Sequence, residues 1–364
     1  MATNTNFNSN NYYKFSKLIS DLIEIFSKEF YLPIKIIKKN DENIEETYKK
    51  KLVKLLNLYE KKISSSNIFK KLYGNVENIV YRFKQVINEN NEGDARIEFE
   101  QLLDFIESMI DNSECGIFKK ENVTLIPGYR VRNKEHKKRK DLFHKPYNDK
   151  TSDDKLNYEN KFTGRFSSKE ALFFSDDVKT TIIETNLLDG NKINGKLSIA
   201  KLKYEQNPYA HVSYYDFGLN PKLFSEYPAK IAEYHSTSQA FYEWYILWFP
   251  IMMSCLFVNI DGSDIFYKYS NWFYDWAIKK YNIDGEIMMI RYISCKPNNK
   301  NLFANNYVIY TKPSDKDEEY SKLIRECYRL TIPECYDKDT LVQKIEVELT
   351  LKDEESLDYV NVNE

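Results

Sequence analysis

The stretch that decides the fold is residues 141–185, DLFHKPYNDKTSDDKLNYENKFTGRFSSKEALFFSDDVKTTIIET. Within it, residues 171–174 (ALFF) are apolar and lie between charged residues, which predicts a buried strand. Residues 175–177 (SDD) follow, and because these types cap helices, we expect a helix from there to Glu184. The stretch therefore predicts a strand–helix unit between Arg165 and Glu184, which brings both side chains to one cleft.

Arg165 and Glu184 are candidate site residues because of what their side chains can bind. A fixed guanidinium grips a phosphate through two parallel hydrogen bonds. A carboxylate stabilises positive charge that develops on a sugar carbon. Together they suit a substrate with a pyrophosphate and a labile glycosidic bond. From spacing alone, the alternative is a surface arginine and a glutamate on an exposed helix face.

Length and composition describe a packed protein without a strong overall charge. The 364 residues include 53 Lys and Arg against 55 Asp and Glu, a formal net charge of -2. No global field therefore draws the chain to nucleic acid or to a membrane. The 29 Tyr and 22 Phe favour a folded core, since disordered chains lack aromatic residues.

The cysteines and the N-terminal residues predict a cytoplasmic protein. The five cysteines are odd in number, widely spaced and form no CxxC pair; they are Cys115, Cys255, Cys295, Cys327 and Cys335. Residues 1–11 are rich in Asn and lack the apolar run of a signal peptide, so we expect a disordered leader.

The most apolar run, residues 244–260, is expected to be buried in the protein. It is shorter than the ~20 residues that a bilayer requires. Pro250 interrupts it, which predicts a buried helix ending at Pro250 and then a second apolar element. Cys255 is then a packing residue with a raised pKa and low reactivity.

Residues 12–115 are expected to form a helical bundle. Apolar residues recur at helical spacing in four stretches. They are Phe15, Leu18, Ile19, Leu22 and Phe26; Leu52, Leu55, Leu56 and Tyr59; Val76, Ile79, Val80, Phe83 and Ile87; and Phe99, Leu102, Leu103, Ile106 and Ile110. Asp94 is the expected N-cap of the last helix.

The remainder of the chain predicts a mixed domain over residues 120–315 and an extension over 316–364. We expect strands at 123–131, 195–202 and 305–309, and a helix within 267–281. The extension should hold a helix at 315–329, a strand at 345–351 and an acidic tail from Asp353. The fold class is therefore α+β, a helical bundle followed by a mixed α/β domain.

Three further patterns point away from nucleic-acid and metal chemistry. The basic run 134–140 has no interleaved aromatic residues to stack on bases, so a solvated loop is favoured. Arg130 and His136 fit the R-x(4–6)-H spacing of HEPN-type ribonucleases, but Pro127 and Gly128 disfavour the helix that this motif needs. The four histidines share no metal-like spacing.

Several motifs occur in an order that resembles the RES domain, a family named for Arg, Glu and Ser. The resemblance covers about residues 125–312 and is moderately specific. Its motifs are Tyr129-Arg130, Phe143-His144 with Pro146-Tyr147, Arg165-Phe166-Ser167, Leu172-Phe173-Phe174-Ser175, Glu184, Trp248-Phe249-Pro250-Ile251 with Cys255, Tyr292-Ile293-Ser294 and Asn305-Asn306-Tyr307-Val308-Ile309. RES proteins degrade NAD, have a fold related to ADP-ribosyltransferases and often act as toxins. Several carry a helical N-terminal domain.

The resemblance implies a role for each matched residue. It implies Arg165, Glu184 and Ser294 as catalytic residues, and Tyr129, Arg130, His144, Phe173, Phe174 and Tyr292 as substrate-binding residues. For His144, a core position is the alternative to a place in the cleft. The family is NAD-consuming, so NAD is the implied substrate and neither a cofactor nor a metal is expected. A neutralising or activating protein partner and a homo-oligomer are both compatible with such an effector.

Two departures from the family and two alternative functions stay open. Phe173 or Phe174 stands where the family has a Tyr, which removes a hydroxyl contact. Extra residues separate Asp284-Gly285 from Tyr292, which affects the assignment of Ser294. The expected function is a toxin or anti-phage defence effector that depletes NAD by hydrolysis or phosphorolysis. The alternatives are ADP-ribosyl transfer to a macromolecule and a catalytically decayed RES fold used for binding or assembly.

Overall fold

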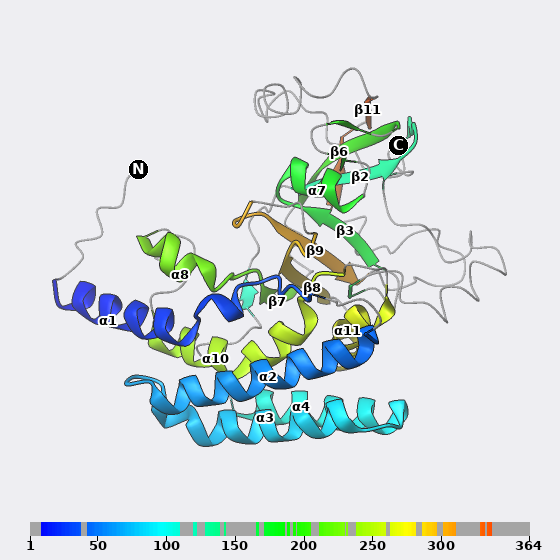
Figure 1. Ribbon diagram of the computed structural model, residues 1–364. Helices are drawn as coiled ribbons and strands as arrows, with labels where there is room; N and C mark the ends of the chain where they lie inside the picture. The colour runs from blue at the N-terminus through cyan, green and yellow to red at the C-terminus, as the bar shows by residue number, and fades with distance from the viewer. Residues whose placement is uncertain are drawn as a thin grey trace. The chain divides into compact units, whose positions relative to one another are not determined.

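The computed structural model has an α+β fold whose contacts divide the chain into two compact units (Figure 1). The structure describes residues 9–37, 42–109, 119–121, 128–138, 142, 165–166, 171–185, 188–189, 192–193, 195–204, 211–229, 231, 238–259, 263–281, 286–296, 301–310, 328–331 and 333–336. The first unit comprises Met1–Gly116 and Leu219–Tyr269, and the second comprises Ile117–Gly218 and Ser270–Glu364. Residues 219–269, expected in the mixed domain, thus group with the N-terminal helices.

The first unit is helical. Its α-helices are α1 (Ser9–Ile25), α2 (Ile44–Ser65), α3 (Tyr73–Asn88), α4 (Glu92–Ser108), α8 (Lys222–Glu226) and α10 (Gln239–Cys255), with 3-10 turns η1 (Lys28–Phe30), η2 (Lys70–Leu72) and η4 (Asp264–Tyr267). The apolar residues predicted to face inward within residues 12–109 are buried, apart from the half-buried Phe15, which confirms these helices. The N-cap of α4 is Asn91, whose Oδ1 accepts from the Gly93 N–H at 2.9 Å, so the prediction of Asp94 was wrong.

The centre of the first unit is a cluster of aromatic rings. The Phe26 ring contacts the rings of Phe30, Tyr59, Tyr245 and Phe249 at centroid separations between 4.6 and 6.5 Å. All five residues are at most 1% exposed. Burial of apolar surface is the main favourable term in folding, and these rings come from the segment after α1, from η1, from α2 and from α10, so the cluster joins these elements into one core.

Helix α10 runs through Pro250, so the prediction that it ends there was wrong. A proline inside a helix lacks the N–H that would donate to the carbonyl four residues earlier. That carbonyl belongs to Ile246, and the Tyr59 hydroxyl donates to it at 2.8 Å. The Tyr48 hydroxyl donates to the Ser254 carbonyl, near the end of the same helix, at 3.0 Å. Tyr59 thus satisfies the carbonyl that Pro250 leaves without a backbone donor, and Tyr48 satisfies a second carbonyl of α10.

The second unit is built on one mixed sheet. Its nine described strands follow the order β1-β7-β8-β9-β3-β2-β6-β10, with β11 also paired to β6. They are β1 (Lys119–Glu121), β2 (Gly128–Asn133), β3 (Ala171–Ser175), β6 (Leu197–Tyr204), β7 (His211–Phe217), β8 (Glu286–Ile293), β9 (Asn305–Tyr310), β10 (Tyr328–Leu330) and β11 (Glu334–Tyr336). A separate hairpin pairs β4 (Leu188–Asp189) with β5 (Lys192–Ile193). The helices of this unit are α7 (Val178–Glu184) and most of α11 (Lys268–Tyr281).

Strands β7 and β8 are a parallel pair in a sheet whose other described pairs are antiparallel. Parallel neighbours need a long crossover connection, because the chain must return to the same end of the sheet. Here the chain leaves β7 at Phe217 and re-enters at Glu286, and residues 219–269 of that connection belong to the helical unit. The two units are therefore interleaved along the chain.

Several predicted elements of the second unit are confirmed. Strands β3, β6 and β9 and helix α11 occur within one to two residues of the expected ranges, and β2 begins at Gly128, inside the strand expected at 123–131. The other strands of this unit, among them the parallel pair β7 and β8, were not predicted. Residues 328–329 form part of β10, where a helix over 315–329 was expected. The rest of that range, residues 123–127 and the strand predicted at 345–351 lie outside the described residues.

Candidate active site

Glu184 is the last residue of α7, and the local sequence fixes this helix firmly. Asp177 is the N-cap, and its Oδ2 accepts from the Thr180 N–H at 2.7 Å, as the capping residues predicted. On the inner face, Ile182 is fully buried against Val131 and Leu197. The short helix is thus held on β2 and β6 by its buried face, and its C-terminal residue has a defined place beside the sheet.

The Glu184 carboxylate accepts two hydrogen bonds on one oxygen. The Ser294 hydroxyl donates to Oε1 at 2.6 Å, and the Asn306 side-chain amide donates to the same atom at 2.8 Å. Ser294 is 6% exposed and Asn306 is 3% exposed. Within the described part of the chain, the other oxygen, Oε2, accepts no hydrogen bond. The two donors therefore orient the carboxylate and leave one oxygen for a further partner.

Arg165 brings a buried positive charge to the same region. Its side chain is 6% exposed. Burial raises the pKa of the neighbouring Cys295 thiol to about 11, the charge of Arg165 opposes this rise in pKa, and the charge of Glu184 adds to it. Cys295 directly follows Ser294, so the charges of Arg165 and Glu184 both act on the residue beside the Glu184–Ser294 contact.

Phe166 holds the turn that carries Arg165. It is fully buried, and its ring lies 5.1 Å from the Tyr292 ring and 6.0 Å from the Phe217 ring. Its φ angle is 54°, in the left-handed region that residues with a bulky side chain rarely adopt. A buried ring in a strained backbone conformation is maintained only where surrounding packing imposes it, and such positions cluster at functional sites.

Strand register assigns the predicted aromatic residues to faces of the sheet. Cross-strand partners share a face, and Asn306 pairs with Ser175 of β3 and with Tyr292 of β8. Ser175 also pairs with Tyr129 of β2. Tyr129, Phe173 and Tyr292 therefore lie on the Asn306 face of the sheet.

Phe174 and Arg130 lie on the opposite face, which separates them from Glu184. Phe174 stacks on Tyr307 at 5.0 Å and with an interplanar angle of 8°. The Arg130 Nε donates to the Leu142 carbonyl at 2.9 Å, and its Nη1 donates to the Phe173 carbonyl. These bonds tie β2 to β3 and to residue 142. His144 is outside the described residues.

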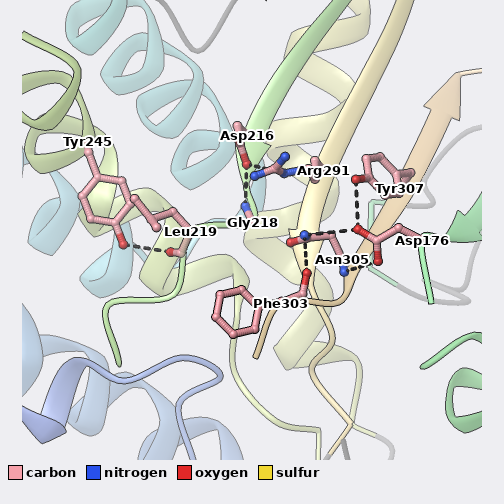
Figure 2. A network of polar contacts seen from close by, with 9 residues as sticks. All are labelled: Asp176, Asp216, Gly218, Leu219, Tyr245, Arg291, Phe303, Asn305 and Tyr307. Carbon is pink, nitrogen blue, oxygen red and sulfur yellow. Dashed lines mark hydrogen bonds and ion pairs between the residues drawn. The ribbon is translucent and has the colours of Figure 1, made fainter. Parts of the chain in front are cut away.

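Figure 2 shows a second polar network, which includes Asn305 and Tyr307. These residues flank Asn306 in β9, so the network lies on the face opposite Asn306. Asp176 accepts from the backbone N–H of Asn305 at 2.7 Å and from the Tyr307 hydroxyl at 3.2 Å. Beside it, Arg291 pairs with Asp216 at 2.9 Å. Burial raises the pKa of Asp176, while bonds from Asn305, the Arg291 charge and the Tyr307 hydroxyl oppose the rise.

Sequence reasoning missed Asn306 and this network. The available signal was a pair of asparagines opening a strand that is otherwise apolar and aromatic, NNYVIY. Buried amides need hydrogen-bond partners, so two of them in succession indicate partners on both faces of a sheet.

No protein-family model, curated protein or solved structure matches the chain. Among the described residues, no group of three or more His, Cys, Asp or Glu side chains is placed to hold a metal ion. In the same part of the chain, every helix is too short or too polar to cross a membrane.

Proposed function

We propose that the sheet-bearing unit cleaves the nicotinamide–ribose bond of NAD, with Glu184 as the residue that stabilises the reacting sugar. The observation that carries the proposal is the Glu184 carboxylate held by Ser294 and Asn306. Two residues that are more than 100 positions from Glu184 in the sequence donate to one oxygen of its carboxylate, and a buried arginine charge acts on the adjoining Cys295. The arrangement fits the substrate chemistry expected from the RES resemblance.

The nicotinamide–ribose bond breaks through a state in which the ribose carbon resembles an oxocarbenium ion. Nicotinamide leaves as a neutral ring, so no acid is required to protonate it. The enzyme must instead stabilise the cation and hold the dinucleotide in place. A carboxylate fixed before the reaction does this well, because it does not have to reorient as the charge develops.

Each residue then has a distinct part. Glu184 offers Oε2 to the ribose, while Ser294 and Asn306 hold Oε1. The Ser294 oxygen accepts from the Lys296 N–H at 3.4 Å, and its second lone pair can accept a hydrogen bond from the carboxamide of nicotinamide. Arg165 binds the pyrophosphate through its planar guanidinium. Tyr292 and Phe173 supply apolar surface on the same face of the sheet.

The identity of the acceptor decides the biological outcome. Water gives hydrolysis, phosphate gives phosphorolysis, and a macromolecule gives ADP-ribosylation. Either of the first two reactions consumes NAD without restoring it. We infer that the protein acts as a toxin or anti-phage defence effector that lowers the NAD level of the cell.

The test is release of nicotinamide from NAD by the purified full chain, followed by chromatography. We expect Glu184→Gln to reduce the rate by about 10²- to 10³-fold, as loss of one stabilising group does in other enzymes. Arg165→Lys, which keeps the charge but loses the fork geometry, should mainly raise KM. Glu135→Gln is the matched control, because Glu135 pairs with Lys196 on the exposed surface.

Absence of nicotinamide release by the wild-type chain, with water or phosphate as acceptor, would contradict the proposal. So would an unchanged rate in Glu184→Gln. Labelled NAD added together with a cell lysate tests the macromolecular acceptor, since label on protein or nucleic acid would indicate ADP-ribosyl transfer.

A further inference from the structure

We propose that Asp176 is a positioning residue that holds Asn306 against Glu184 from the opposite face of the sheet. The hydrogen bonds of Asp176 within the described part of the chain go to Asn305 and Tyr307, and not to Glu184 or its donors. It acts through the backbone of β9, where Asn306 lies between two residues that Asp176 binds. The inference rests on the proposed function only in that Glu184 is the catalytic carboxylate.

The first step of the argument is that one carboxylate binds both neighbours of Asn306. Asp176 Oδ1 accepts from the Asn305 backbone N–H at 2.7 Å. Its Oδ2 accepts from the Tyr307 hydroxyl at 3.2 Å and from the Asn305 side-chain amide at 3.4 Å. Figure 2 shows both side chains turned toward Asp176. Alternation along a strand then directs Asn306 to the opposite face, where Glu184 lies.

The second step is that residues 175 and 176 also bind the Asn305 carbonyl. We call the hydrogen bonds of Ser175 and Asp176 with Asn305 and Tyr307 the clamp. The Asp176 N–H donates to the Asn305 carbonyl at 3.1 Å, and the Ser175 hydroxyl donates to that carbonyl at 2.8 Å. Asn305 is therefore bound at its N–H, its carbonyl and its side chain. A residue fixed at three points cannot shift along the strand, so the start of β9 has one register.

The third step is that this segment also begins the helix that carries Glu184. Asp177, the next residue, is the N-cap of α7. The segment 175–177 thus joins the strand that supplies the donor to the helix that supplies the acceptor. A displacement of the segment moves Asn306 and Glu184 relative to each other, and a misplacement of about 1 Å can reduce a rate by 10²-fold.

The Asn305 side chain is closely packed on the side that faces Arg291 and Gly218. The positive charge of Arg291 acts on the Asp176 carboxylate, and the Arg291 side chain forms an ion pair with Asp216. The Asp216 Oδ1 accepts from the Gly218 N–H at 2.8 Å. A Cβ added at Gly218 would lie 2.4 Å from Asn305 Oδ1 and 2.6 Å from Arg291 Nε. Gly218 is therefore required for Asn305 to keep its place, and Gly218→Ala disturbs the clamp without changing Asp176.

The experiment compares Asp176→Ser, Tyr307→Phe and Gly218→Ala with the control Asp177→Ser in the full chain. Serine is too short to bridge Asn305 and Tyr307, but at position 177 it caps a helix about as well as aspartate does. The control therefore makes the same chemical change at the next residue and preserves α7.

The first readout is independent of catalysis. Selective ¹⁵N labelling of asparagine gives an NMR signal for the Asn306 side-chain amide, assigned by its disappearance in Asn306→Ser. We expect that signal to shift and to exchange with solvent at least about tenfold faster in the three clamp variants, because the bond to Glu184 weakens. Asp177→Ser should leave it in place.

The second readout is nicotinamide release. We expect kcat to fall by about 10- to 100-fold in Asp176→Ser, and less in Tyr307→Phe, with KM unchanged, since binding groups are untouched. An Asn306 signal that is identical in the clamp variants and the wild type would overturn the proposal. A signal that moves without a fall in kcat would overturn it as well.

The two readouts separate this proposal from the proposed function. If the wild-type chain releases no nicotinamide, the Asn306 signal alone decides whether Asp176 positions the amide. If Asp176→Ser fails to fold, Tyr307→Phe decides, because it removes one hydroxyl and keeps the ring stacked on Phe174.

Discussion

Glu184 and Ser294, 110 residues apart in the sequence, share a hydrogen bond of 2.6 Å between side chains. One lies at the end of α7 and the other directly after β8. Neither position is exposed at a flexible tip, so the contact belongs to the packed structure of the sheet unit.

This contact should contribute measurable coupling to stability. In a double-mutant cycle of Glu184→Ala and Ser294→Ala, we expect a coupling energy of about 1.5 to 3 kcal/mol, the range for a hydrogen bond to a charged group. Urea denaturation measures it. Ser198→Ala combined with Glu184→Ala should be additive, since Ser198 bonds to residues 134 and 136 instead. Coupling below about 0.5 kcal/mol would show that the two side chains do not interact in solution.

The alkylation rate of Cys295 should depend on the charges of Arg165 and Glu184 even when no substrate is present. Its pKa of about 11 makes alkylation slow at pH 8, whereas the exposed Cys335 should react readily. Glu184→Gln removes a negative charge that raises the thiol pKa, so labelling of Cys295 should become faster. Arg165→Gln should slow it. Mass spectrometry gives both rates, with Cys335 as the internal reference, and equal Cys295 rates in both variants would contradict the placement of these charges.

Tyr59 and Pro250 should be coupled through the Ile246 carbonyl. Tyr59→Phe leaves this carbonyl without its donor, and we expect a loss of about 1 to 3 kcal/mol in the free energy of unfolding. Pro250→Ala supplies a helical N–H, so the same Tyr59→Phe change should cost less in that background. Tyr48→Phe is the control, because Tyr48 bonds to Ser254 and its loss should not depend on residue 250. Additive effects of Tyr59→Phe and Pro250→Ala would show that the Tyr59 hydroxyl does not replace the N–H that Pro250 lacks.

At Phe166, glycine should be tolerated better than alanine. Either change removes the buried ring, at about 3 to 5 kcal/mol. The φ angle of 54° then favours glycine, because an L-residue in the left-handed region costs about 1 to 2 kcal/mol. At Phe174, a buried position within β3, alanine should be tolerated better than glycine. Thermal unfolding of the four variants measures both orders, and alanine ahead of glycine at Phe166 would argue against the left-handed turn.

Asp176 should make stability depend on pH in a defined direction. Burial raises its pKa above the ordinary value of 3.8. A group whose pKa is raised on folding contributes stability below its unfolded pKa, and this contribution is lost as pH rises through the folded pKa. The stability of the wild type relative to Asp176→Asn should therefore fall as pH increases from 3.8 upward. Urea denaturation over a pH series measures this difference in stability. If the wild type became more stable relative to Asp176→Asn as pH rises above 3.8, the pKa of Asp176 would not be raised by folding.

Local features of the sequence predicted local structure well. Apolar spacing predicted the N-terminal helices, and the run from Ala171 to Glu184 predicted a strand, a cap and a helix in that order. These signals lie within a few residues of the structure they specify. Pro250 misled the prediction because the carbonyl that it leaves without a backbone donor is satisfied by Tyr59, 187 positions away in the sequence.

The candidate site depended on relations that periodicity does not contain. Which face Asn306 occupies follows from its register with β3 and β8, and a slip of one residue would turn it away from Glu184. The same register decides which of Phe173 and Phe174 shares the face of Asn306, which the sequence left open. The parallel pairing of β7 with β8 is non-local in the same way.

The interleaving of the two units limits how this protein can be divided. The chain crosses between them after Gly116, Gly218 and Tyr269. No single cut yields either unit as a continuous polypeptide, so recombination cannot transfer the sheet to another protein without the helical segment that includes α10. Removal of the N-terminal helices would strip α10 of Phe26 and Tyr59, leaving bare aromatic surface. The segments that form the two units therefore have to be transferred together.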